Sequence, residues 1–177
     1  MQVQKLIFSL TKVEKAYLAG LLDGEGYISI TLGRGSDGKQ YYQPVVGILS
    51  SVHEDFVRKV EDILSKSDLK FYHITVKRGK PIYFKTQRQL FQVTLKGQNR
   101  CRSFLSEIEP YLVLKKDIAQ ITIEWCESRI ERRGHAYNHR EIEIIKEVRK
   151  LNGERTGRIK YPYKEIERIP EHPVVLH

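Results

Sequence analysis

The residues best suited to chemistry stand in one short acidic segment, Asp23-Gly24-Glu25-Gly26, which follows an uncharged stretch from Tyr17 to Leu22. Carboxylate oxygens are hard ligands that suit magnesium, and bound magnesium can activate water for hydrolysis of phosphate esters. A carboxylate in a glycine-rich turn can also be an ordinary surface group, but the uncharged stretch before it makes that the poorer interpretation. For Asp23 we favour a hydrogen bond to nearby backbone over a catalytic role.

A predicted helix carries the uncharged stretch and places the acidic residues at its end. Thr11 and Glu14 have the spacing of an N-terminal capping box, and we expect the helix to continue through Leu22. A surface helix would show a polar face there. This helix should therefore be covered on nearly all sides, which is more than one small domain usually provides.

The remaining pattern predicts an α+β domain with two antiparallel hairpins. Alternating residues predict strands over about 27–32, 40–49, 71–78 and 83–95, with turn residues between the members of each pair. A second capping box at Ser51–Glu54 should begin a helix that ends near residue 64. Further helices are expected over about 98–112, 115–130 and 138–151. The order is αββαββα with additional C-terminal helices. We expect one domain over residues 1–152, followed by a basic extension over 153–177 that is extended or partly disordered.

The charge balance favours a polyanionic partner. The chain has 31 Lys and Arg against 22 Asp and Glu, a net charge of +9 and a pI of about 9.5. Such a balance suits nucleic acid or an anionic membrane surface, although charge alone is equally compatible with a merely basic soluble protein. No basic amphipathic helix with bulky aromatic residues stands out, so nucleic acid is the preferred partner.

Several features bear on the cellular compartment. No apolar run approaches the roughly 18 residues that a membrane helix needs, and the N-terminus lacks the layout of a secretory signal. The only two cysteines, Cys101 and Cys126, resemble no zinc site and are expected to be buried thiols. We therefore expect no membrane partner and an intracellular location, in a prokaryotic cytoplasm or an organelle.

The segment from Leu18 to Gly26 resembles the signature of the LAGLIDADG homing endonucleases. Its sequence LAGLLDGEG has six of the nine signature residues and departs at Leu22, Gly24 and Glu25. The predicted element order agrees over roughly residues 10 to 130. The resemblance implies a metal-dependent endonuclease that cuts both strands of a long pseudo-palindromic DNA site and leaves short 3′ overhangs. An intron maturase or a non-cleaving nucleic-acid-binding protein is the alternative, but relatives that lost cleavage usually lack the acidic residue that Glu25 supplies.

The single copy of the motif implies a homodimer in which the first helices of two chains pack about a two-fold axis. Ala16 and Gly20 lie four residues apart, so their small side chains would allow close approach on one helical face. The expected interface residues are Ala16, Leu18, Ala19, Gly20 and Asp23. This pairing would also explain the uncharged helix and would bring the two copies of Glu25 together.

The resemblance also assigns the catalytic residues and the cofactor. Glu25 would bind the metal and act in catalysis, assisted by the backbone carbonyl of Gly24. The metal would be Mg²⁺, with Mn²⁺ or Ca²⁺ able to replace it for binding. In the stretch from Pro110 to Lys116, Lys115 maps onto the family's lysine near the scissile phosphate, with Lys116 as its competitor and an ordinary solvated lysine as the bland alternative. Ser50 is the candidate for the polar residue that organises water, with Ser51 and His53 nearby.

In this family four strands form an antiparallel saddle in the major groove of double-stranded DNA. For this chain we expect double-stranded DNA as the partner, and RNA is less favoured. The polar phase of each strand is then the candidate base-reading set, unless these residues are only the solvated face of a sheet. The set comprises Ser29, Thr31, Arg34, Lys39, Tyr41, Gln43, His73, Thr75, Lys77, Arg88, Gln92 and Thr94.

Overall fold

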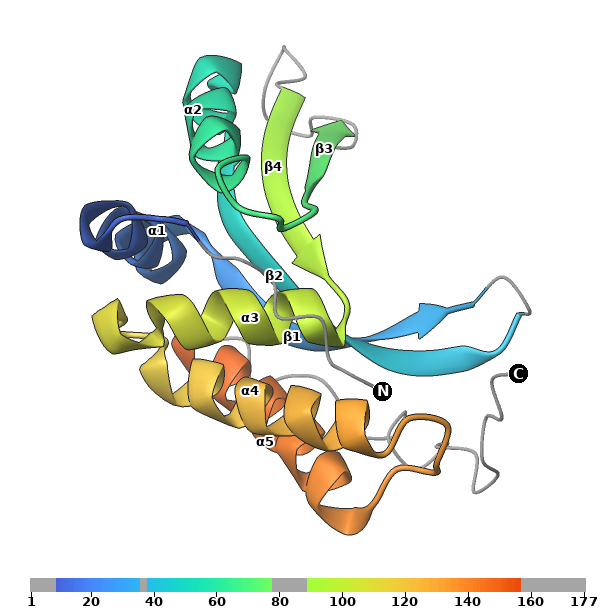
Figure 1. Cartoon of the computed structure of the whole chain (residues 1–177). Helices are drawn as coiled ribbons and strands as arrows, with labels where there is room; N and C mark the ends of the chain where they lie inside the picture. Colours follow the sequence, from blue (N-terminus) through green and yellow to red (C-terminus); the bar gives the residue numbers. More distant parts are fainter. Residues whose placement is uncertain (1–8, 36–37, 78–88, 157–177) are drawn as a thin grey trace.

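Four antiparallel strands form a curved sheet whose convex face is covered by helices (Figure 1). The structure is a computed structural model, and it describes residues 9–35, 38–77 and 89–156. The elements are α1 (Lys12–Glu25), β1 (Tyr27–Arg34), β2 (Gln40–Ser51), α2 (Glu54–Leu64), β3 (Tyr72–Lys77), β4 (Gln89–Lys96), α3 (Gln98–Ile108), the short 3-10 helix η1 (Glu109–Tyr111), α4 (Lys116–Glu131) and α5 (His139–Thr156). The predicted αββαββα order with additional C-terminal helices is confirmed.

The strand order in the sheet is β1-β2-β4-β3, so the two hairpins meet at the central pair β2 and β4. Alternate residues of the strands, such as Ile28, Val46 and Val93, are buried beneath the helices. The core continues into the C-terminal helices through Phe104 and Trp125. The other sheet face is turned away from α1, α2 and α3, and we call it the open face (Figure 1).

Helix α1 begins as predicted and ends later than predicted. Thr11 Oγ1 accepts a hydrogen bond from the N–H of Glu14 at 3.2 Å, and the Glu14 carboxylate accepts one from the Thr11 N–H at 2.9 Å. The helix runs on to Glu25, and the N–H of Gly26 closes it on the carbonyls of Leu21 and Leu22. A Cβ at Gly26 would lie 2.5 Å from the Gly47 carbonyl oxygen, so glycine is needed where the chain turns against β2.

The chain covers only one side of α1, so the expectation that this helix is covered on nearly all sides is not met within one copy. Leu18, Ala19 and Leu22 are fully buried in the chain's own core, while the opposite side of the helix is exposed. A helix without charges over one turn can thus have one face in the core and a second apolar face at the surface.

The second capping box is also corrected, because Ser51 is the last residue of β2 rather than a helix cap. Its Oγ accepts the N–H of His53 at 3.1 Å, and α2 begins at Glu54 without a side-chain cap. A β-bulge between Gly47 and Leu49 adds a residue to this strand, which shifts its end relative to the predicted boundary.

The C-terminal helices brace the sheet from the β1 side. The carboxylate of Glu141, at the start of α5, is fully buried and accepts hydrogen bonds from Ser128, Arg129 and the N–H of Asn138. Near the other end of α5, the Asn152 amide donates to the carbonyl of Ile28 on edge strand β1 at 2.8 Å. Helix α5 continues to Thr156, four residues past the predicted domain boundary, and the remaining tail lies outside the described residues.

Both cysteines are buried free thiols, and burial raises the pKa of Cys101 to about 12. Within the described ranges, no helix has the length and apolar character that crossing a bilayer would require.

Candidate active site and nucleic-acid interface

The centre of the open face is a row of four residues, one from each strand. The register places Tyr27, Gly47, Thr94 and Tyr72 side by side across β1, β2, β4 and β3. The Tyr27 ring lies over Gly47, where a Cβ would come 2.1 Å from its Cε1 atom. Both tyrosines are exposed. Sequence analysis missed them, because the candidate set was taken from the polar phase of each strand.

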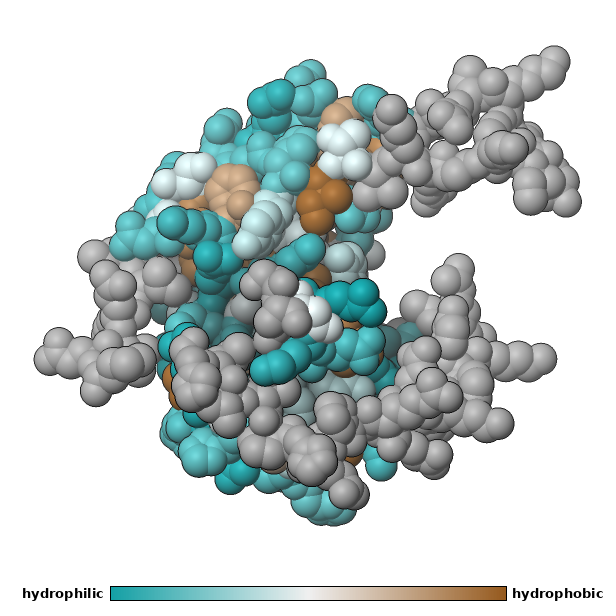
Figure 2. Space-filling model, turned by 90° about the vertical axis from the view of Figure 1, so that its right-hand side faces the viewer, coloured by the Kyte–Doolittle hydropathy of each residue, from teal (hydrophilic) through white to brown (hydrophobic). Residues whose placement is uncertain are grey.

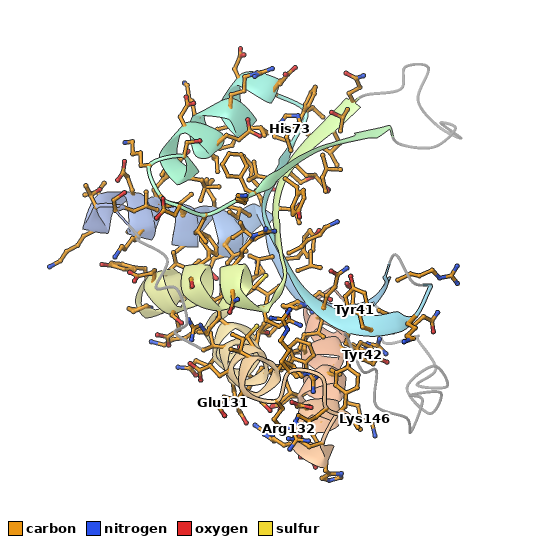
Figure 3. The ribbon with its side chains drawn as sticks, turned by 45° about the vertical axis from the view of Figure 1, so that its right-hand side comes forward. Tyr41, Tyr42, His73, Glu131, Arg132 and Lys146 are labelled. Atoms are coloured by element: carbon orange, nitrogen blue, oxygen red, sulfur yellow. The ribbon has the colours of Figure 1, made fainter. Side chains whose placement is uncertain are left out.

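The β1–β2 hairpin presents the predicted polar phase. Ser29 and Thr31 lie opposite Val45 and Gln43, on the side of the sheet away from the core residues Ile28 and Ile30. In Figure 3, Tyr41 lies on the concave side of β2, whereas Tyr42 lies on the side of α5. Tyr42 is buried there, and its N–H donates to the Tyr137 hydroxyl. Exposed Arg34 and Lys39 stand at the hairpin tip, where the Gly35 N–H bonds the Lys39 carbonyl.

The predicted phase of β3 is wrong. His73 pairs with the buried Val93, and its Nδ1 lies 2.6 Å from the carboxylate of Glu61 on α2, so it faces the helices (Figure 3). Thr75 follows in the same phase. Strand β3 presents its apolar residues Tyr72 and Ile74 to the open face instead, while its polar residues His73 and Thr75 face the helices. The side chain of Lys77 and all of Arg88 lie outside the described residues.

The assignment of Thr94 to base contact is corrected as well. Its side chain has the predicted phase, but the residue is fully buried between its neighbours on the central strand pair. Its Oγ1 has no hydrogen-bond partner in the described part of the chain. Alternation along a strand identifies the face of the sheet on which a residue lies. It does not show how far neighbouring tyrosines cover that residue.

Ser50 and Gln92 form a polar pair at the end of β2. The bulge places both Ile48 and Leu49 toward the core and so turns Ser50 to the open face, opposite Gln92. The Gln92 amide donates to Ser50 Oγ at 3.1 Å. Two residues predicted for different roles, water organisation and base reading, are therefore neighbours.

The end of α1 meets the segment that precedes α4. The Asp23 carboxylate accepts the backbone N–H groups of Val113, Leu114 and Lys115 at 2.7, 3.2 and 2.9 Å. The prediction that Asp23 bonds backbone is confirmed, although the partners lie far along the chain rather than nearby. The Lys115 ammonium donates to the carbonyls of Leu22, at 2.8 Å, and Asp23. Sequence positions 23–25 and 115 are thus brought together, whereas Lys116 pairs with Glu109.

Glu25 itself is exposed and uncommitted. Among the described residues, its carboxylate has no hydrogen bond or ion pair, and the neighbouring Gly24 is exposed too. The carbonyl end of a helix carries a partial negative charge that favours cations, and the Lys115 ammonium already binds there. A carboxylate beside helix-end carbonyls is the hard-oxygen donor set that Mg²⁺ prefers. Within the described ranges no three His, Cys, Asp or Glu side chains of one copy gather around a common point.

Only some of the residues predicted for the dimer interface are exposed. Leu18 and Ala19 are fully buried within the chain, and Asp23 is engaged with the backbone of 113–115, so their assignment to the interface is corrected. Ala16 and Gly20 are exposed. With them on the same side of α1 lie Val13, 78% exposed, and Tyr17, 41% exposed.

Comparisons with known proteins identify the fold. No protein-family model matches the chain, and no curated protein matches it in sequence. Among solved structures, the homing endonuclease I-CvuI in complex with the I-CreI target has a TM-score of 0.56 at 14% identity, covering 89% of this chain and 92% of that one. The archaeal intron-encoded homing endonuclease I-Vdi141I complexed with DNA has a TM-score of 0.54 at 17% identity, covering 89% of this chain and 94% of that one. The LAGLIDADG meganuclease I-AabMI bound to uncleaved DNA has a TM-score of 0.53 at 15% identity, covering 92% of this chain and 50% of that one. In agreement with its motif, the chain has the fold of the LAGLIDADG homing endonucleases.

Proposed function

We propose that the chain is a site-specific endonuclease that cuts both strands of DNA as a homodimer with a divalent metal. The observation that carries this proposal is the uncommitted carboxylate of Glu25 at the carbonyl end of α1, beside the Lys115 ammonium. The solved structures of this fold that are complexed with DNA support double-stranded DNA as the partner. The site would be a long pseudo-palindrome cut to leave short 3′ overhangs, and the enzyme would work inside a cell or organelle.

The residues at the end of α1 have complementary roles in this proposal. Glu25 and the Gly24 carbonyl would hold Mg²⁺, for which Mn²⁺ or Ca²⁺ could substitute in binding. Once bound, the ion would lower the pKa of a water molecule and neutralise charge on the phosphate. Asp23 fixes the backbone that carries Lys115, whose ammonium can stabilise charge that develops on the scissile phosphate. The Ser50–Gln92 pair offers a hydroxyl and an amide that can orient the attacking water.

A second copy would complete this site. Neither Gly20 nor Gly24 has any atom within 4 Å of the position where a Cβ would stand, so a single chain gives no steric reason for either glycine. Glycine within a helix costs up to about 1 kcal/mol relative to alanine. Close packing of two α1 helices along Val13, Ala16, Tyr17 and Gly20 would explain both residues and bury an exposed apolar stripe. The second Glu25 would then arrive beside the first.

The dimer surface would extend beyond the helix. Val113 and Leu114 are 83% and 63% exposed, although both are apolar, and each donates a backbone hydrogen bond to the Asp23 carboxylate, which holds their backbone in place. An apolar pair held rigidly at the surface suits contact with another protein surface. Its attachment to the end of α1 makes it a continuation of the same interface.

The test is a cleavage assay in magnesium against a duplex carrying the gene's own insertion site without its intron. We expect linear double-strand breaks from the wild-type protein and none from Glu25→Gln. Asp62→Asn is the matched control, because Asp62 is an exposed carboxylate on α2. Loss of cleavage with retained DNA binding in E25Q would support the proposal. RNA binding without any DNA cut by the wild-type protein would instead support the maturase alternative, and equal cleavage by both variants would remove Glu25 from the reaction.

A further inference from the structure

Two basic side chains converge on one tyrosine at the β3 side of the open face. The Lys96 Nζ lies 5.7 Å and the Arg100 guanidinium carbon 5.8 Å from the centre of the Tyr72 ring. Arg100 Nη1 also donates a hydrogen bond to the Tyr72 hydroxyl at 3.1 Å. Lys96 ends β4, Arg100 lies in the first turn of α3 and Tyr72 begins β3, so three elements supply the cluster. We call these three residues the Tyr72 cluster.

The cluster carries two positive charges and no negative one. Within the described ranges, neither Lys96 nor Arg100 forms an ion pair, whereas other basic residues such as Lys15, Arg58 and Arg140 have carboxylate partners. The ring face attracts cations, which offsets part of the mutual repulsion of the two charges. No acidic residue of the described chain neutralises these two charges. A bound anion would neutralise them.

The cluster lies on the open face, against which the proposed function places the DNA duplex. Tyr72 belongs to the central row of that face, and Lys96 pairs with Val45 in the phase of Ser29 and Gln43. Figure 2 looks onto this side of the molecule, which is hollowed and carries hydrophilic residues beside a few hydrophobic ones. Lysine and arginine at such positions contact phosphate oxygens more often than bases, and these contacts fix the register of the duplex.

We infer that the Tyr72 cluster is a phosphate clamp that holds the DNA backbone on the β3 side of the open face. This inference rests on the proposed function. Lys96 and Arg100 contact the phosphate, and Tyr72 is a positioning residue: its hydroxyl accepts the Arg100 hydrogen bond and so fixes the direction of the guanidinium. The contact is independent of base sequence.

The test measures binding of the protein to a duplex of arbitrary sequence at several salt concentrations. Each phosphate contact contributes about 0.9 to the slope of log affinity against log salt. We expect Lys96→Ala and Arg100→Ala each to reduce the slope by about one and to weaken binding roughly tenfold at 0.1 M salt. Lys59→Ala is the matched control, because Lys59 is an exposed lysine on α2, which packs against the other face of the sheet.

Tyr72→Phe separates positioning from ring packing, because it keeps the ring and removes the hydroxyl. We expect Y72F to weaken binding in the wild-type chain and to have no further effect in the R100A background. K96A and R100A indistinguishable from K59A, in a wild-type protein that does bind duplex, would overturn the clamp alone. A wild-type protein without duplex affinity would overturn the proposed function and the clamp together. If R100A does not fold, K96A, Y72F and Arg100→Lys provide the same comparison.

Discussion

At the residue scale, the candidate site depends on one carboxylate that binds backbone. Asp23 lies between Leu22, which is in the core, and Glu25, which is uncommitted, and it uses both oxygens to hold the backbone before α4. Lys115 extends from this backbone to the end of α1, where its ammonium donates to the carbonyl of Leu22. The motif therefore contains two acids in different situations: Asp23 holds the backbone of 113–115, and Glu25 has no partner among the described residues.

Replacing Asp23 should reveal the structural role directly. Asp23→Asn keeps one acceptor oxygen but loses the charge and an acceptor, so part of the hydrogen bonding to Val113, Leu114 and Lys115 is lost. Hydrogen bonds to charged groups contribute about 1.5–3 kcal/mol each, and we expect a loss of roughly that size in the free energy of unfolding. Chemical denaturation measures it, with Asp62→Asn as the control. A D23N protein as stable as the control would contradict the bracing role.

At the element scale, the predictions succeeded where local sequence decides and failed where neighbouring strands decide. The capping box at Thr11 needs only four residues of sequence, and it is present. The capping box predicted at Ser51 is absent, because pairing with β4 keeps Ser51 in the sheet. The phase of β3 was wrong for a similar reason: pairing with β4 places His73 on the side of the helices, where its Nδ1 contacts Glu61. The bulge that turns Ser50 outward has no signal in the sequence that we recognised.

The capping box of α1 predicts a pH dependence. Hydrogen bonds from Lys66 and Thr11 lower the pKa of Glu14 from 4.5 to about 2. A carboxyl whose pKa is lowered by folding contributes stability above its unfolded pKa and loses it as the pH falls toward the folded value. The stability difference between wild type and Glu14→Gln should therefore be full above about pH 5 and shrink between pH 4.5 and 2. Urea denaturation across this range measures it, and a difference independent of pH would contradict the role of the ionised carboxylate.

At the scale of the whole molecule, a basic chain of 177 residues presents an open sheet face, the Glu25 carboxylate without a partner among the described residues, and an apolar stripe on α1. Charge and the motif were enough to indicate nucleic acid and the fold from the sequence. The division of α1 into a core side and a surface side was not predictable, because an uncharged stretch does not show which of its residues the rest of the chain will bury.

Two glycines of the motif distinguish packing within a chain from packing between chains. Gly20→Ala meets no atom within 4 Å, so replacement should stabilise the isolated helix by up to about 1 kcal/mol while it separates the two helices of a dimer. Gly26→Ala would instead place a Cβ 2.5 Å from the Gly47 carbonyl oxygen and should destabilise the fold itself. Analytical ultracentrifugation should therefore show G20A as a folded protein with a weakened dimer, and Leu114→Ser should weaken the dimer in the same way. A wild-type protein that is monomeric with and without DNA, or a G20A dimer as tight as wild type, would exclude α1 as the pairing helix, and Glu25 would then have to bind metal without its symmetry mate.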